Sequence, residues 1–468
     1  MTLDKQAVST GLILLVVGIG AFMDGLDGAI VNVSLPEIAT GFNADISTAS
    51  LVLTIYLVAL SSLMVIFAKI SSFTGTKKIY IGGLAIFTIA SLFCAAAWNI
   101  ETLIAFRALQ GLGAAMIAPS AVATIAVHVR ESERAKSLGV IAAASALAFA
   151  LGPVTGGLIT EFLSWHWIFL INLPIGIVAI ILAYYFLEDD ARGDITVRAF
   201  DYPGAVLFFV AMTLFILPLG FLGEKPVGLF NPVYFLIVSA VVFLLFILAE
   251  KKAQDPVMDL SLFSSRGFSC SVIAYSFAML AYGGIILILP FFFQGILAMS
   301  PGEAGLFLLI PSLIITVLSP VGGSLADKKG AGIVCTVSSV IILLAFLMMG
   351  FISPASTLGL LVAALVIMGI GFGPFMSAGS SRIIEHSGEG RREMASGIMS
   401  TSIYFGTALG TALFTAIFSY FSGGDNGSAA GIQVSSFMSG FFAVVIAGIL
   451  FSIIVIVTSF LAGKKANT

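Results

Sequence analysis

The chain has 468 residues, of which 59% are hydrophobic and 10% are charged, with a formal net charge of −3. A soluble globular protein carries about 25% charged residues, so this composition excludes that class and indicates a polytopic membrane protein. The charges are few and of mixed sign, so no nucleic-acid partner is expected.

Spanning helices need about 20 apolar residues each, and the sequence contains fourteen stretches of that kind. In chain order they cover residues 11–34, 48–68, 79–98, 102–126, 137–160, 166–187, 202–222, 232–249, 267–291, 303–324, 331–352, 356–378, 395–420 and 437–461. We therefore predict an all-α integral membrane protein with a six-helix bundle in 1–200, an inserted helix pair in 201–250 and a second six-helix bundle in 251–468.

The distribution of Lys and Arg predicts the orientation of these spans. When the chain is threaded through the fourteen stretches, nineteen of its 21 Lys and Arg residues fall on one side. Loops rich in these residues stay in the cytoplasm, so both termini and the linker Asp189–Asp201 are expected there. The exceptions are Lys225, in an outer loop, and Arg107, inside a span. Arg107 therefore needs a functional explanation.

An internal repeat relates the two predicted bundles. Ala68–Gly75 and Gly323–Gly330 have similar sequences, follow the second span of each bundle and lie 255 residues apart. Two similar halves are typical of alternating-access transporters, whose substrate site lies between the halves near the middle of the membrane. The alternative is a gene duplication without transport.

Asp24 and Asp27 are the acidic residues that lie well inside a predicted span. A charge at mid-membrane costs about 2.5 to 3.5 kcal/mol, so such residues normally line a cavity or pair with a partner. Placed three residues apart, the two carboxylates share a helix face, and two close carboxylates in a low dielectric do not both ionise easily. We predict that they carry protons. Alternatively, one acid only neutralises Arg107 and the other points into water.

Depth in the membrane makes a pair of Arg107 and Asp27 geometrically possible and places Asp24 one turn deeper. Arg107 lies about 8 Å from the outer end of its helix, and Asp27 lies about 13 Å below Pro36, at 1.5 Å per residue. If a proton neutralised Asp27, Arg107 would lose its counter-ion. The protonated and deprotonated proteins would then differ in energy, as coupling requires.

Other residues of the spans are candidates for the half-to-half interface and for the substrate pocket. The fifth span carries small or helix-bending residues that permit close helix contact and a bend, either as a hinge and seal or as ordinary packing: Gly152, Pro153, Gly156 and Gly157. The pocket candidates carry an aromatic ring, a hydroxyl or an amide inside a span: Tyr56, Phe149, Tyr275, Gln294 and Tyr404. Each of these could equally be structural. No metal-ligand or catalytic set is found, so we expect no cofactor, metal or enzymatic activity.

Five segments resemble motifs of the major facilitator superfamily, specifically its fourteen-helix drug:proton antiporters of the EmrB/QacA type. These segments are Leu26–Pro36, Leu103–Ala115, Ala148–Gly157, Trp165–Pro174 and Phe200–Gly204. The resemblance implies the major facilitator fold, with two pseudo-symmetric six-helix bundles and two additional helices. It also implies a buried arginine at Arg107, an antiporter motif from Gly152 to Gly157, and gating loops that contain Gly75, Asp327 and Gly330.

The resemblance and the membrane acids together favour a proton-coupled exporter of small hydrophobic or amphiphilic compounds, driven by protons that enter through Asp27. Its partners would be a small-molecule substrate, protons and the lipid bilayer of the plasma membrane, and we expect a monomer. The alternatives are an uptake symporter, a lipid exporter of the same fold, and a receptor or scaffold without transport.

Overall fold

The protein is described by a computed structural model that covers residues 10–189, 201–222, 231–253, 256–354, 358–388, 391–423 and 433–463. In these residues the structure is helical, and fourteen helical segments are long and apolar enough to cross a membrane, as the sequence predicted. The helices are α1 (Thr10–Gly41), α2 (Ile46–Thr74), α3 (Thr76–Ala95), α4 (Ile100–His128), α5 (Glu131–Phe162), α6 (Trp167–Leu170), α7 (Asn172–Phe186), α8 (Tyr202–Leu219), α9 (Pro232–Glu250), α10 (Arg266–Phe291), α11 (Pro301–Lys329), α12 (Ala331–Met349), α13 (Leu358–Glu385), α14 (Arg392–Phe421) and α15 (Val434–Gly463). Two short helical turns, η2 (Leu260–Ser264) and η3 (Phe292–Ile296), flank α10, and α6 and α7 together form the sixth span.

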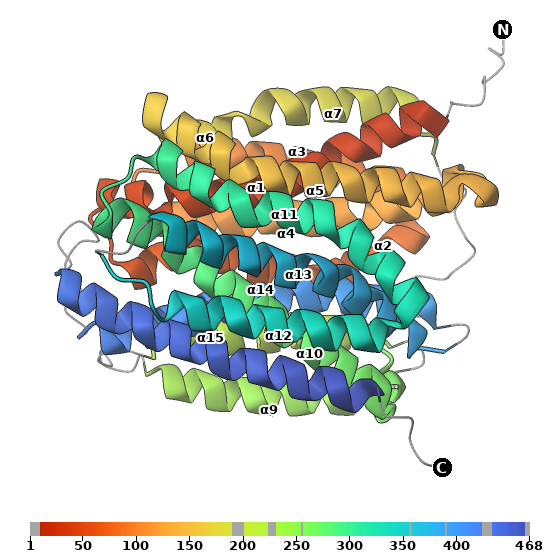
Figure 1. Cartoon of the computed structure of the whole chain (residues 1–468). Coiled ribbons are helices and arrows are strands. Elements are labelled where there is room, and N and C mark those ends of the chain that lie inside the picture. The colour runs from red at the N-terminus through yellow and green to blue at the C-terminus, as the bar shows by residue number, and fades with distance from the viewer. Residues whose placement is uncertain are drawn as a thin grey trace, which may run out of the picture.

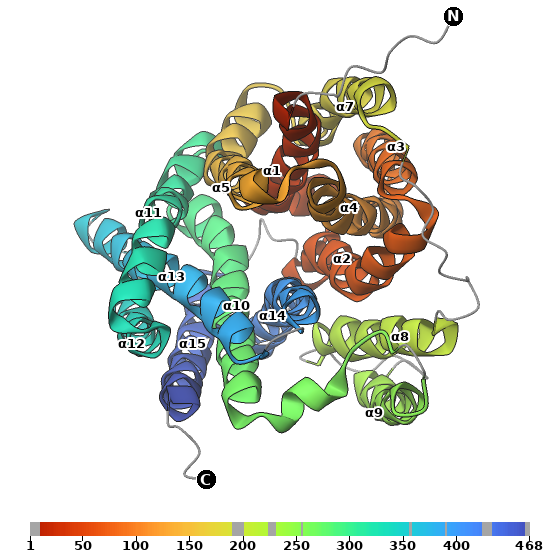
Figure 2. The ribbon, with the colours of Figure 1, turned by 90° about the vertical axis from the view of Figure 1, so that its right-hand side faces the viewer.

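The spans run side by side and form two groups, one of α1 to α7 and one of α10 to α15 (Figures 1 and 2). We call the end of the bundle where α1 begins and α15 ends the proximal end, and the opposite end the distal end. Polar residues between the spans cap the N-termini of several helices. Asp45 accepts a hydrogen bond from the Thr48 N–H at the start of α2, and capping boxes begin α4 at Asn99 and α11 at Ser300.

The repeat is visible in the backbone at equivalent positions of the two halves. Gly75 separates α2 from α3 with φ 96°, and Gly330 separates α11 from α12 with φ 89°. Residues with a side chain rarely adopt this backbone conformation. Glycine at both positions therefore allows the chain to reverse direction between two antiparallel helices.

Of the two additional helices, α8 packs beside α2 and α14, and α9 packs against α8 (Figure 2). Phe208 and Met212 of α8 and Phe246 of α9 form one buried cluster with Val58 of α2 and Ala408 of α14. Because α2 and α14 belong to different halves, the pair covers one seam between the halves.

The described helices differ from the predicted spans mainly in their lengths. The predicted span 356–378 ends before Arg382, whereas α13 continues to Glu385 and buries Arg382. Lys225 and residues 190–200 of the linker lie outside the described residues.

Candidate functional site

Asp27 lies at the centre of a buried polar network in the first half. Its side chain is 0% exposed and accepts hydrogen bonds from three residues on two other helices. Arg107 of α4 donates to Oδ2 at 2.6 Å, and Gln110 of α4 and Asn172 of α7 donate to Oδ1 at 2.9 and 3.2 Å. Gln110 also donates to the Ser91 hydroxyl of α3 at 2.8 Å. Three N–H donors, one of them cationic, therefore surround this carboxylate.

Arg107 is also 0% exposed, and its guanidinium contacts backbone, amide, carboxylate and aromatic groups. Its Nε donates to the carbonyl oxygen of Val52 at 3.0 Å, and its Nη1 donates to Gln110 as well as to Asp27. The guanidinium carbon lies 4.2 Å from the centre of the Tyr56 ring and 5.8 Å from that of Phe169, within the range of cation–π attraction. The remaining nitrogen, Nη2, has no hydrogen-bond partner among the described residues. One donor is therefore available for a further acceptor.

Asp24 has a different environment, although it lies only one turn away on α1. Its carboxylate accepts a hydrogen bond from the Tyr56 hydroxyl at 2.8 Å and from the Tyr404 hydroxyl at 3.4 Å. Tyr56 belongs to α2 of the first half, and Tyr404 belongs to α14 of the second. The donors to Asp24 found among the described residues are thus neutral, and they connect the two halves.

A small central cavity lies beside this network. It has a volume of 50 Å³ and is lined from both halves by residues that include Arg107, Tyr56, Phe149, Tyr282 and Thr407. Fifty cubic ångströms admits a few water molecules, whereas drug-sized ligands occupy about 300 to 1,000 Å³. A ligand of that size therefore needs the halves to move apart.

Three glycines in the second part of α5 lie where it packs closely against other helices. A Cβ atom at Gly152 or Gly156 would collide with Ala29 or Ile30 of α1, and one at Gly157 would collide with the backbone of Pro301 on α11. Gly157 thus brings the two halves together near the distal end. α5 runs without interruption through Pro153.

Two further contacts join the halves at the distal end. Glu161 of α5 accepts hydrogen bonds from the Ser300 hydroxyl at 2.7 Å and from the Gly302 N–H at 2.9 Å, at the start of α11. The Gln294 side chain donates to the carbonyl oxygen of Val33 at 2.8 Å. Gln294, a predicted pocket residue, is therefore found at the seam between the halves.

Of the other predicted residues, Tyr275 lies outside the lining of the central cavity. It is buried in the second half, where its ring stacks on Phe375 with centres 6.1 Å apart. Asp327 and Gly330 are exposed, and both border a larger cavity at the proximal end of the second half.

In addition to the helix arrangement and the buried Asp27–Arg107 pair, the sequence of the chain matches a family model. The model described as "Major Facilitator Superfamily" matches residues 17–205 and 271–467, which is most of the chain. The chain belongs to the Major Facilitator Superfamily. The matched segments stop just inside α8 and resume in α10.

Relatives of this superfamily member include transporters with different named substrates. It is 32% identical over 403 residues to the riboflavin transporter RibZ of Clostridioides difficile (strain 630), covering 85% of this chain and 87% of RibZ. It is 33% identical over 340 residues to the multidrug transporter protein MdtP of Bacillus subtilis (strain 168), covering 70% of this chain and 61% of MdtP. It is also 30% identical over 421 residues to the methylenomycin A resistance protein of the same strain, covering 87% and 88%. The last two names agree with the resemblance to drug exporters, whereas the first names a vitamin. The protein is a multi-pass membrane transporter and not an enzyme.

A solved structure supports the fold of this superfamily member. The bacterial homologue of the human lysosomal transporter Spinster superimposes with a TM-score of 0.70 and 17% identity, covering 97% of this chain and 96% of that one. At that identity the likeness concerns the fold alone.

Three residues of the polar network were not assigned a role from the sequence: Ser91, Gln110 and Asn172. Gln110 and Asn172 lie inside motif segments that the sequence did identify, at polar positions within apolar helices. Such an amide in a span needs a partner, and this requirement was the available signal. Glu161 lay at the end of its predicted span and gave no such signal.

Proposed function

We propose that the protein is a proton-coupled exporter of small hydrophobic or amphiphilic compounds that works by alternating access, with its proximal end in the cytoplasm. The observation that carries this proposal is the pair of aspartates on one face of α1. Asp27 is paired with Arg107 inside the first half, and Asp24 accepts hydrogen bonds from both halves.

Protonation affects the two acids differently. A proton on Asp24 removes the charge that attracts the Tyr404 hydroxyl, which weakens one contact between the halves. A proton on Asp27 removes the counter-ion of Arg107, whose guanidinium then needs another acceptor. The free Nη2 of Arg107 beside the central cavity can donate to a substrate or to water. The free energy of binding each proton therefore differs between the two arrangements of the halves, and this difference couples proton binding to the movement of the halves.

The electrochemical gradient is large enough for this task. One proton moving through about 150 mV releases about 3.5 kcal/mol, which supports a substrate gradient of a few hundredfold.

Riboflavin, or a compound with a similar fused ring, is a second candidate substrate class. The relative named as a riboflavin transporter matches along most of both chains. Several rings surround the central cavity, namely those of Tyr56, Phe149 and Tyr282, and aromatic side chains stack on flat ring systems.

The test uses purified protein in proteoliposomes with an imposed pH gradient, a pH dye inside, and either ethidium or riboflavin as the probe. We expect probe accumulation that a protonophore abolishes. We also expect Asp24→Asn and Tyr404→Phe to lower the dependence of the flux on the gradient, whereas Tyr420→Phe, at an exposed position on the same helix, behaves like wild type. Flux of both probes that is equal with and without the gradient would contradict proton coupling. Accumulation of riboflavin without ethidium would favour the second substrate class.

A further inference from the structure

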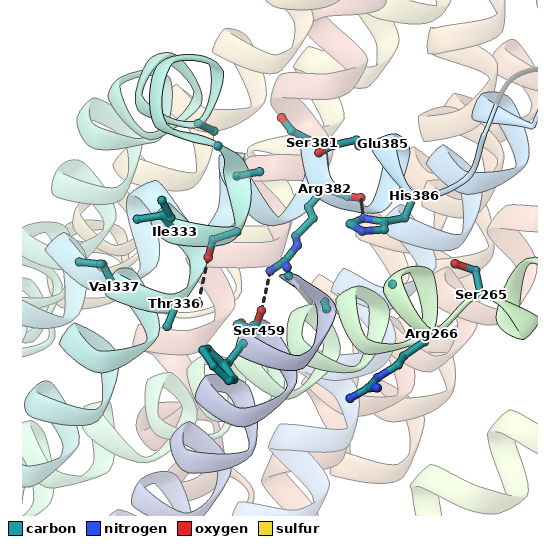
Figure 3. Close-up of a pocket in the computed structure, with 18 of the residues that line it drawn as sticks. Ser265, Arg266, Ile333, Thr336, Val337, Ser381, Arg382, Glu385, His386 and Ser459 are labelled. Atoms are coloured by element: carbon teal, nitrogen blue, oxygen red, sulfur yellow. Dashed lines mark hydrogen bonds between the residues drawn. The ribbon is translucent and has the colours of Figure 1, made fainter. Parts of the chain in front are cut away.

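A second cavity, the basal cavity, lies inside the second half at the proximal end, and Figure 3 shows residues that line it. Its lining does not include Asp24 or Asp27. Its volume is 1370 Å³, and it is bordered by the first turns of α10 and α12 and by the last turns of α11, α13 and α15. A cavity of this size can hold the headgroup of a lipid together with part of an acyl chain.

The buried charge in the wall of the basal cavity is Arg382. The residue is 3% exposed, reaches from α13 toward α15, and donates from Nη1 to the carbonyl oxygen of Ser459 at 2.8 Å (Figure 3). No ion pair joins it to a carboxylate of the described residues. The acids that border the cavity, Asp327 and Glu385, are exposed, as is Arg266. A buried cation without a carboxylate is costly, so this wall favours the binding of an anion.

Two further groups beside Arg382 can donate hydrogen bonds to the same anion. The Ser459 hydroxyl belongs to a residue that is 1% exposed, and it has no partner among the described residues. α12 begins at Gly330 without a side-chain cap, and a Cβ atom on its second residue, Gly332, would lie 3.2 Å from Arg382 Nη2. Phosphate groups are commonly bound by donors of these kinds, namely a guanidinium, a hydroxyl and the uncapped backbone amides of a helix N-terminus.

The mouth of the basal cavity is apolar. Ile333 and Val337 of α12 and Phe460 of α15 border the cavity and are 60%, 54% and 56% exposed. These side chains suit the acyl chains of a lipid and have no role in binding a free phosphate ion. Basic pockets between transmembrane helices are known to bind lipid headgroups. We infer that the basal cavity binds an anionic glycerophospholipid, with its phosphate at Arg382 and its acyl chains along α12 and α15.

The test measures the thermal unfolding midpoint of the purified full-length protein in detergent, with added short-chain phosphatidylglycerol, short-chain phosphatidylcholine or inorganic phosphate. Phosphatidylglycerol should raise the midpoint of the wild type, because a ligand that binds only the folded state stabilises it. Arg382→Gln should bind it at least about tenfold more weakly, equivalent to about 1.4 kcal/mol. Arg391→Gln, which changes an exposed arginine outside the cavity, should respond like wild type.

A second pair of variants keeps the test decisive if Arg382→Gln does not fold. Ile333→Glu places a like charge at the mouth and should abolish the response to phosphatidylglycerol, while Ile333→Gln, of the same size, should retain it. Equal responses of wild type and Ile333→Glu would overturn the proposed site. Stabilisation by inorganic phosphate that matches phosphatidylglycerol would overturn the lipid assignment, and so would an equal effect of phosphatidylcholine.

Discussion

The sharpest prediction concerns the free energy of the Asp27–Arg107 pair. Both side chains are fully buried, and their closest atoms lie 2.6 Å apart. Asp27→Asn leaves the guanidinium without a counter-ion, and it also presents an amide N–H₂ to Gln110 and Asn172, which donate to Asp27 in the wild type. Removing one partner of a buried pair costs about 3 to 5 kcal/mol, so Asp27→Asn and Arg107→Gln should each lower the free energy of unfolding by that amount.

The double variant Asp27→Asn/Arg107→Gln separates the charge pair from the packing around it. With both charges gone, neither is left unpaired, and neutral replacement of a buried pair is often close to neutral in stability. We expect the double variant to be more stable than either single variant, with an interaction energy of about 3 kcal/mol in the double-mutant cycle.

The assay is unfolding by sodium dodecyl sulfate in mixed micelles, followed by tryptophan fluorescence, with proton-driven flux measured on the same preparations. Glu37→Gln is the matched control, because it makes the same kind of change at an exposed position of α1 and should leave stability unchanged. The double variant should fold and yet lack proton-driven flux. A stability of Asp27→Asn within about 0.5 kcal/mol of wild type would refute the reasoning, as would a double variant no more stable than the worse single variant.

Two other predictions concern the seam and the orientation. Gly157→Leu should destabilise the arrangement in which α5 meets Pro301 by about 1 to 3 kcal/mol, lowering its population 5- to 150-fold, and flux should fall while the protein still folds. Gly139→Leu on the same helix, where the added side chain meets open space, should transport like wild type, and a similar loss there would contradict the explanation. A cysteine at Asn43, between α1 and α2, should react with an impermeant thiol reagent added to intact cells, and one at Lys251 should not. The reverse pattern would refute a cytoplasmic proximal end.

The fold could be predicted because the membrane spans and their orientation depend on hydrophobicity and charge along the chain, which are read directly from the sequence. Fourteen apolar stretches correspond to fourteen helical segments of the described residues that are long enough to span a membrane, and the sequence repeat at Gly75 and Gly330 lies at matching backbone turns. Counting residues from the helix ends also placed Asp27 within reach of the long side chain of Arg107, and the structure joins the two in an ion pair.

Contacts between distant helices could not be predicted in the same way, because they depend on how each helix is rotated about its axis. Tyr404 lies 380 residues from Asp24, and nothing in the local sequence indicates that they meet. The sequence places Arg382 in a cytoplasmic loop because the apolar stretch ends before it, yet α13 continues to Glu385 and packs Arg382 against α15. A charged residue in the last turn of a helix looks the same in sequence whether it faces water or a protein cavity.

In the proposed mechanism, the two aspartates of α1 meet two different requirements. A coupling site must be stable in the membrane, so any buried charge needs a strong partner. It must also respond to the arrangement of the halves, so it needs a partner that moves with the other half. Asp27 satisfies the first requirement, since its donors Arg107, Gln110 and Asn172 all lie within one half. Asp24 satisfies the second, since Tyr404 lies across the seam. One helical turn between them lets the charge of each acid influence the other. In the proposed mechanism, a change at the seam can therefore act on the buried pair through Asp24, while the contacts of Asp27 within the first half stay intact.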